Sequence, residues 1–171
     1  MPTTYTRADA DTMRLLEQAV NTWHLQLKHH KVSIGVLMAG NPDGPAVSHG
    51  GYPAAAKIKI VSLKDRLTKK FDAELIIDED HWKSCSDEHK LALLDHELSH
   101  IEVAFNKNGG VKLDDLGRPK LKSVPGDIVQ SDGFRDVIRR HREFAPEYIN
   151  HRVAAHQIND AMDAVVNESA A

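Results

Sequence analysis

The chain is poor in cysteine, in aromatic residues and in long apolar runs, and the shortage of cysteine and of apolar runs excludes whole classes of protein. Cys85 is the only cysteine among 171 residues, which excludes an internal disulfide and is typical of a reducing compartment. No apolar run approaches the roughly 20 residues of a transmembrane helix, so we expect no membrane partner. The N-terminal residues lack the charged and apolar regions of a signal peptide. These absences predict a cytoplasmic protein.

Charge of one sign is also lacking. The 22 lysines and arginines face 25 acidic residues, which gives a net charge of −3 and no general attraction to nucleic acid or anionic lipid. Basic residues concentrate in one stretch, from Lys57 to Lys70. Because interleaved charges of this kind more often form a solvated surface, nucleic acid is kept only as an alternative partner through Lys57–Lys70.

Hydrophobic periodicity predicts one α+β domain over residues 1–171, with a core of about 8–145 and a C-terminal helix of about 146–168. The expected elements, in chain order, are a helix over 8–30, strands over 32–38, 57–61 and 73–78, a long helix from about 87, a hairpin over 111–122, and helices over 131–141 and from 146. The strands would form a small, three-stranded, mixed sheet.

Two of these segments are expected to shape a binding cleft. The Gly/Pro-rich loop over residues 39–53 is longer than a simple connection needs, which is typical of a cleft wall. Residues 74–77 form an apolar strand just before the long helix. If that strand lies at the sheet edge, an extended peptide can add to it through main-chain hydrogen bonds.

The most specific pattern in the chain is His96-Glu97-x-x-His100, an HExxH motif. Residues four apart lie one above the other on a helix, so both imidazoles can face the same tetrahedral metal ion. Glu97 lies about 60° around the helix from His100, at about 100° per residue, which places its carboxylate beside the metal. The motif therefore predicts a zinc hydrolase in which His96 and His100 are ligands and Glu97 is the general base.

The surrounding sequence supports a helix at the motif. Ser84 to Asp87 fit a capping box, and Asp87 and Glu88 suit the positive end of a helix dipole. Apolar residues recur at helical spacing through the segment, namely Leu91, Leu94, Leu98, Ile101 and Phe105. We therefore expect the helix to continue to Phe105. An amphipathic helix with two solvent-facing histidines is the simpler alternative.

The chain resembles a known family at this point. A helix, a short sheet, HExxH on a helix and further helices make up a minimal zincin-like domain, and the chain is similar to small metallopeptidases encoded by bacteriophages. The residues that carry the resemblance include Ala73–Trp82, Ala92–His100 and Gly133–His141, together with the Asp-Leu-Gly-Arg-Pro-Lys-Leu sequence of the expected hairpin. The resemblance implies zinc-dependent hydrolysis of peptides or proteins in the cytoplasm of an infected or lysogenic bacterium.

A catalytic zinc site needs a third protein ligand, and several residues qualify. Related phage proteins carry a His-Asp pair after the hairpin, where this chain has Gly126-Asp127. Asp127 is the first choice because it matches that aspartate and a carboxylate is an accepted zinc ligand. His141 is the chemically favoured ligand type and Asp132 is a further alternative. Asp95 is expected to support a ligand or the packing of the helix.

Two other functions fit the same motif. An SprT-like protease that acts on nucleic-acid-associated proteins also carries HExxH in a compact domain, and it would need the basic stretch as its contact. A catalytically silent zincin-like module would use the cleft only for binding. Glu97 argues against the silent module, because a structural zinc site has no need of a general base.

Overall fold

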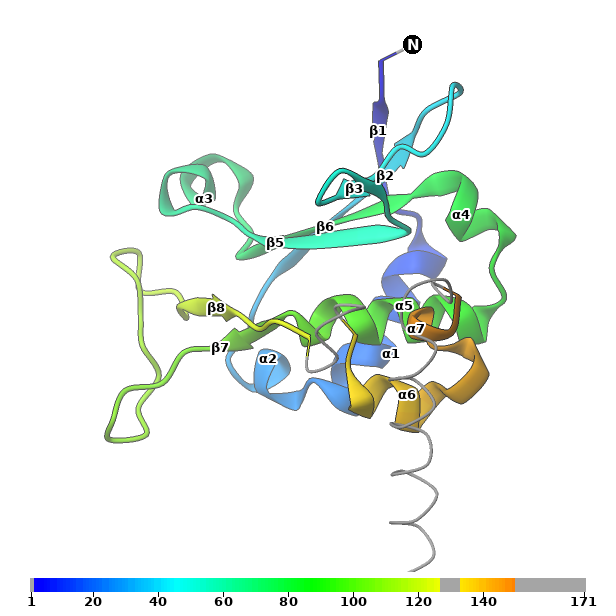
Figure 1. Cartoon of the computed structure of the whole chain (residues 1–171). Coiled ribbons are helices and arrows are strands. Elements are labelled where there is room, and N and C mark those ends of the chain that lie inside the picture. Colours follow the sequence, from blue (N-terminus) through cyan, green and yellow to red (C-terminus); the bar gives the residue numbers. More distant parts are fainter. Residues whose placement is uncertain (1, 127–132, 150–171) are drawn as a thin grey trace, which may run out of the picture.

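The computed structural model describes residues 2–126 and 133–149 (Figure 1). Its main sheet has the strand order β1-β2-β6-β5, with β2 and β6 parallel and the outer pairs antiparallel. The strands are β1 Thr4–Arg7, β2 Ile34–Gly40, β5 Ala56–Ile60 and β6 Ala73–Asp78. The α+β class and the mixed sheet are therefore confirmed, with one strand more than the sequence predicted.

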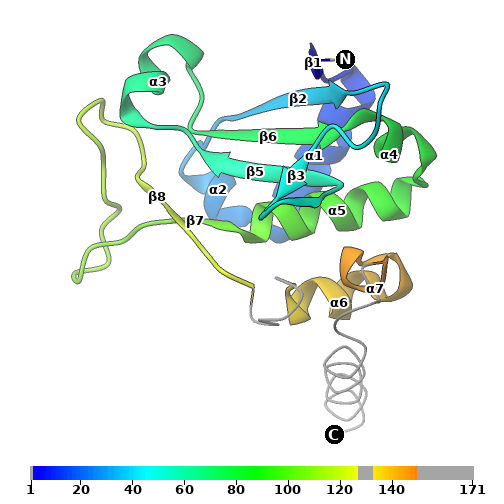
Figure 2. The same cartoon turned by 45° about the horizontal axis from the view of Figure 1, so that its top comes forward.

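The helices flank this sheet and continue beyond it. Their bounds are α1 Ala10–Trp23, α2 Leu25–His29, α3 Leu63–Lys69, α4 Glu79–Ser84, α5 Asp87–Ser99, α6 Arg135–His141, the short 3-10 helix η1 Arg142–Phe144, and α7 Pro146–Ile149. Figure 2 shows α1 and α5 beneath one face of the sheet and α6 and α7 below α5. Within the described ranges, no helix has the length and apolar character needed to cross a bilayer.

The core lies between that sheet face and the helices α1 and α5. Alternate residues of the two central strands point into it, and Leu75 and Ile77 of β6 are fully buried. Leu94 and Leu98 of α5 pack from the other side, one turn apart. This packing fixes the inner face of α5 and leaves its opposite side available to a functional site.

The N-terminal helix is shorter than predicted because the chain turns at His24. The backbone of His24 has φ −118° and ψ 49°, outside the helical region, and it separates α1 from α2. His24 is buried, and its Nε2 lies 2.7 Å from Asp95 Oδ1 on α5. A tertiary contact therefore accompanies a break that the hydrophobic pattern did not reveal.

Strand β1 was also missed, because its four residues are all exposed and give no hydrophobic alternation. It pairs antiparallel with β2, with Thr4 opposite Gly40 and Arg7 opposite Leu37. As a result, β1 and β5 are the two edges of the sheet. The condition set for peptide binding at residues 74–77, that their strand lies at the sheet edge, is not met, since β6 is paired on both sides.

The motif helix ends earlier than the apolar spacing suggested. Helix α5 begins after Ser86, whose side chain accepts a hydrogen bond from His89 N, and it ends at Ser99. The expected continuation to Phe105 is wrong, because Ile101–Val103 forms strand β7 and pairs with β8, Leu121–Ser123. His100 keeps a helical backbone, with φ −74° and ψ −6°, so the motif stays on one turn.

The predicted hairpin exists, but it is longer than expected. Strands β7 and β8 form its base, and beyond them the chain makes two smaller turns, one closed by a bridge between Phe105 and Val111 and the other by a bridge between Leu113 and Pro119. Gly109 and Gly117, one in each turn, have φ 80° and 71°, conformations that favour glycine. The hairpin carries the chain from the end of α5 to residue 124, beside the motif.

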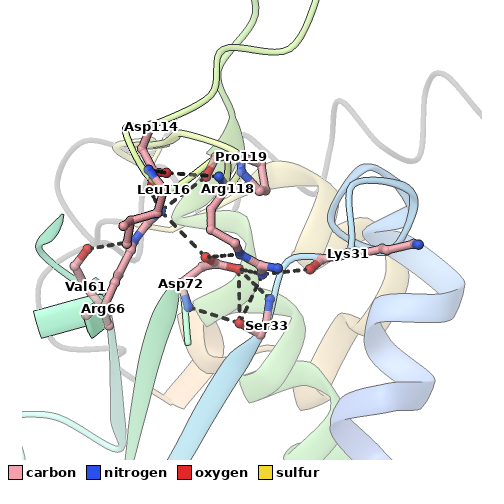
Figure 3. Close-up of polar contacts among 9 residues, drawn as sticks. All are labelled: Lys31, Ser33, Val61, Arg66, Asp72, Asp114, Leu116, Arg118 and Pro119. Carbon is pink, nitrogen blue, oxygen red and sulfur yellow. Dashed lines mark hydrogen bonds and ion pairs between the residues drawn. The ribbon is translucent and has the colours of Figure 1, made fainter. Parts of the chain in front are cut away.

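An ion network fastens this hairpin to the end of the sheet (Figure 3). Arg118 binds both carboxylate oxygens of Asp72, the residue before β6, and Arg66 Nη1 lies 2.5 Å from Asp114 Oδ2. Burial raises the pKa of Asp72, but hydrogen bonds from Arg118 and Ser33 outweigh it and hold that pKa below its ordinary value. The network therefore holds the hairpin, whose strand β8 leads to residue 124 beside the motif, against the end of the sheet.

Candidate metal centre

An open cleft of about 1470 Å³ lies along the edge strand β5 and the motif helix α5. His96, Glu97 and His100 all line it. The loop over residues 39–53, which contains the short strands β3 Ser48–His49 and β4 Tyr52–Pro53, lines another side. The expectation that this loop is a cleft wall is therefore confirmed.

The two motif histidines point their outer ring nitrogens at the same place. His96 Nε2 and His100 Nε2 are 3.3 Å apart. Two nitrogen ligands at about 2.05 Å from a tetrahedral zinc ion are separated by about 3.3 Å. The spacing of the two nitrogens therefore fits a pair of zinc ligands.

The other nitrogen of each ring faces an oxygen that can only accept a hydrogen bond. His100 Nδ1 lies 3.0 Å from the carbonyl oxygen of Val124, and His96 Nδ1 lies 3.0 Å from Oε1 of Glu147. In a neutral imidazole, a proton on Nδ1 leaves a lone pair on Nε2. Two lone pairs 3.3 Å apart repel each other unless a cation lies between them, so the hydrogen bonding also fits a metal site.

Glu97 lies beside this pair and is held by the sheet. Its side chain is buried, with 6% of its surface exposed, and Oε2 accepts a hydrogen bond of 2.8 Å from the backbone N–H of Ile58 in β5. Because Ile58 N points at Glu97, it takes no part in the pairing of β5 with β6. The edge strand thus orients the carboxylate in the cleft.

Two residues beyond the hairpin complete the surroundings of the histidines. The ring of Phe134 lies edge-on to both imidazoles, with centroids 5.6 Å from His96 and 4.8 Å from His100. Glu147 Oε1, which faces His96, also accepts a hydrogen bond of 2.8 Å from Phe134 N. Burial raises the pKa of Glu147, but hydrogen bonds from His96 and Phe134 outweigh it and lower that pKa below its ordinary value.

The candidates for a third ligand have different outcomes. Asp127 and Asp132 lie outside the described residues. His141 is placed away from the histidine pair, with its Nε2 3.0 Å from Asp95 Oδ2. Within residues 2–126 and 133–149, no group of three His, Cys, Asp or Glu side chains could hold a metal ion.

Asp95, next to the motif, is the centre of a buried network on the other side of α5. Its carboxylate contacts His24, His141 and Arg140, with Arg140 Nη1 at 2.8 and 2.9 Å from its two oxygens. Burial raises the pKa of Asp95, but the hydrogen bonds from the three partners outweigh it and hold that pKa well below its ordinary value. The expectation that Asp95 supports packing agrees with this network, which ties α5 to α6 and to the turn between α1 and α2.

Replacing Asp95 by asparagine is expected to destabilise the protein by about 3 kcal/mol, because it leaves Arg140, His24 and His141 without a buried anion. A carboxylate with a lowered folded-state pKa stabilises the protein above its unfolded pKa, and that contribution is lost as the pH falls through the folded value. The stability difference between the wild type and Asp95→Asn should therefore shrink as the pH falls below about 4. Urea unfolding across this range measures both effects.

The exposed Asp136, which pairs with Arg139 on α6, provides the control. Asp136→Asn should change the free energy of unfolding by less than about 1 kcal/mol. Equal stability of Asp95→Asn and Asp136→Asn would show that the network around Asp95 does not stabilise the fold.

Three basic residues of the stretch Lys57–Lys70 form ion pairs within the fold. Lys59 and Lys69 both pair with the buried Glu74, at 2.5 and 2.6 Å, and Arg66 is buried against Asp114. Lys59 and Lys69 keep 48% and 38% of their side chains exposed, so of these three only Arg66 is enclosed by the fold.

Four groups that form part of the site were not predicted from the sequence. They are Ile58 N–H, Val124 C=O, the ring of Phe134 and the carboxylate of Glu147. Two are backbone groups, which any residue supplies, and the sequence carries no signal for them. Phe134 packs with Val137, Ile138 and Ala145 in a small separate hydrophobic cluster, and Glu147 of α7 is joined to it by the hydrogen bond from Phe134 N.

Comparison with known proteins bears on the chain as a whole. A model of the family described as "Putative phage metallopeptidase" matches residues 3–165. Neither the curated proteins nor the solved structures gave a significant match.

Proposed function

The chain belongs to this family of phage metallopeptidases, and from that premise we propose that it is a zinc-dependent peptidase. His96 and His100 hold the metal and Glu97 is the general base. The observation that carries the proposal is the convergence of the two Nε2 atoms to 3.3 Å, with both Nδ1 atoms facing oxygen acceptors. That arrangement fits a cation and leaves each ring one possible metal-binding atom.

Asp127 is proposed as the third ligand. Both ends of the segment that contains it are fixed at the histidine pair. On one side Val124 C=O accepts from His100, and on the other the ring of Phe134 contacts both imidazoles. A carboxylate from this segment would complete a three-ligand site with one open position, as catalytic zinc requires.

A zinc ion held by His96, His100 and Asp127 would supply a Lewis acid that lowers the pKa of a bound water molecule and polarises the scissile carbonyl. Glu97 accepts the proton of the attacking water and delivers it to the leaving amine, so one carboxylate acts first as base and then as acid. The hydrogen bond from Ile58 N–H keeps this carboxylate turned into the cleft.

The edge strand β5 favours a peptide as the substrate. Ile58 N–H points away from β6, and outward-pointing backbone groups recur at every second residue of an antiparallel edge strand, here Ala56 and Ile60. Ile58 N–H is already bonded to Glu97, but Ala56, Ile58 and Ile60 line the cleft, so an extended chain can pair with the outward backbone groups of Ala56 and Ile60 and with the carbonyl of Ile58. We therefore propose unfolded or extended segments of proteins as substrates, with little demand on their sequence.

The test combines metal analysis with hydrolysis. Purified protein is expected to contain about one zinc per chain and to cleave a denatured protein faster than the same protein folded, since strand addition needs extended backbone. A chelator should abolish cleavage, and one equivalent of zinc should restore it. Cleavage that persists after verified removal of metal would contradict the proposal.

A further inference from the structure

The carboxylate of Glu147 is buried behind His96, one of the two motif histidines. Glu147 is 1% exposed and lies on α7, 51 residues from His96 in the sequence. One of its oxygens serves two donors, His96 Nδ1 and Phe134 N, while the other, Oε2, is buried and has no hydrogen-bond partner among the described residues. Burying a carboxylate with an unsatisfied oxygen is costly, so this side chain needs a compensating charge nearby.

The position of Glu147 relative to His96 indicates that a metal ion bound by His96 can supply this compensating positive charge. Glu147 contacts His96 at Nδ1, whereas the atom that converges with His100 is Nε2 on the far side of the same ring. Glu147 is therefore placed behind the ring rather than among the ligands. A metal cation at Nε2 makes the Nδ1 proton more acidic and strengthens its bond to an anion, which compensates the buried charge.

We propose that Glu147 is a positioning residue that fixes His96 in the Nδ1–H form and raises the affinity of the site for zinc. This inference rests on the proposed function. It adds that metal binding depends on the C-terminal cluster of α6, η1 and α7, outside the motif helix and the main sheet. The shared oxygen also ties His96 to Phe134, the residue that precedes α6 and touches both imidazoles.

The two histidines are held differently, and the difference makes the proposal specific. His100 has a neutral acceptor, the carbonyl of Val124, while His96 has a carboxylate. A charged acceptor makes the imidazole a stronger donor of electrons to the metal than a carbonyl does. Loss of Glu147 should therefore weaken zinc binding through His96 alone.

The experiment compares Glu147→Gln and Glu147→Ala with the wild type. The zinc dissociation constant is measured by competition with a chromophoric chelator, and the protonated nitrogen of His96 is identified by 15N NMR of the zinc-free protein. Glu147→Ala is expected to bind zinc about 10- to 100-fold more weakly and to lose the fixed Nδ1–H form. Glu147→Gln keeps an acceptor oxygen without the charge, so its zinc affinity should lie between those of the wild type and Glu147→Ala.

Glu143→Gln is the matched control, because Glu143 is an exposed carboxylate four residues earlier, on η1. It should leave zinc affinity and the His96 tautomer unchanged. Thermal unfolding of the zinc-free variants separates loss of fold from loss of positioning.

Two outcomes would overturn the inference. One is unchanged zinc affinity in both Glu147 variants, whether or not their unfolding temperature falls. Loss of all zinc from Glu147→Gln would make Glu147 a ligand instead. If the wild type itself binds no zinc, the proposed function fails before this comparison begins, so the two failures are distinct.

Discussion

Replacing Glu97 by glutamine is expected to lower the rate of peptide hydrolysis by about 10²- to 10⁴-fold, the usual contribution of a general base. The zinc content should stay near one per chain. Glutamine is nearly isosteric and its amide oxygen can still accept the hydrogen bond from Ile58 N–H, so the cleft should keep its shape. What is lost is the ability to take a proton from water. The measurement is the initial rate of cleavage of a denatured protein, with metal analysis of the same sample.

Glu88→Gln is the control for this variant, since Glu88 is an exposed residue in the first turn of the same helix. It should cleave at the wild-type rate. If Glu97→Gln were to lose its zinc, Glu97 would be a ligand rather than a base. If it kept full activity, the proposed mechanism would be wrong.

Loss of either motif histidine is expected to remove both metal and activity. His96→Ala and His100→Ala each delete one of the two Nε2 atoms that lie 3.3 Å apart, and a zinc site that loses one of three protein ligands binds far more weakly. Zinc content after dialysis and the cleavage rate should fall together. His29→Ala, at an exposed histidine on α2, should change neither. Metal stoichiometry that survived both motif substitutions would refute the proposed site.

The same measurement applied to Asp127→Ala identifies the third ligand. Zinc is expected to be lost from this variant and retained by Asp132→Ala, a substitution of the same type in the same short segment. The opposite result would transfer the role to Asp132. Zinc retained by both variants would leave Asp127 and Asp132 without that role.

How much of the site was predictable depends on how far apart its parts are in the sequence. The pairing of His96 with His100 is local, because the helical repeat alone brings residues four apart onto one face. Strand β6 was predicted at its observed bounds, Ala73–Asp78, because a short apolar run needs no distant information. The loop over residues 39–53 was recognised by its length and composition, and it lines the cleft.

Tertiary packing decided the rest. The choice of β5 rather than β6 as the edge follows from pairing between distant segments, and the hydrophobic pattern of a strand does not specify its neighbours. His141 was a reasonable ligand by chemistry, but the fold places it against Asp95. The motif helix ends at Ser99 because Ile101–Val103, which follow His100, pair with Leu121–Ser123.

The sequence alone determined the α+β class, the helix that presents His96, Glu97 and His100, and the family to which the chain belongs, because each is written in local spacing or in contiguous motifs. Only the tertiary structure decided what holds the two imidazoles: a carbonyl from the end of the hairpin for His100 and a carboxylate from α7 for His96. Hydrogen-bond partners 24 and 51 residues away are brought together by the packing of the hairpin and the C-terminal cluster, and no periodic pattern records that packing.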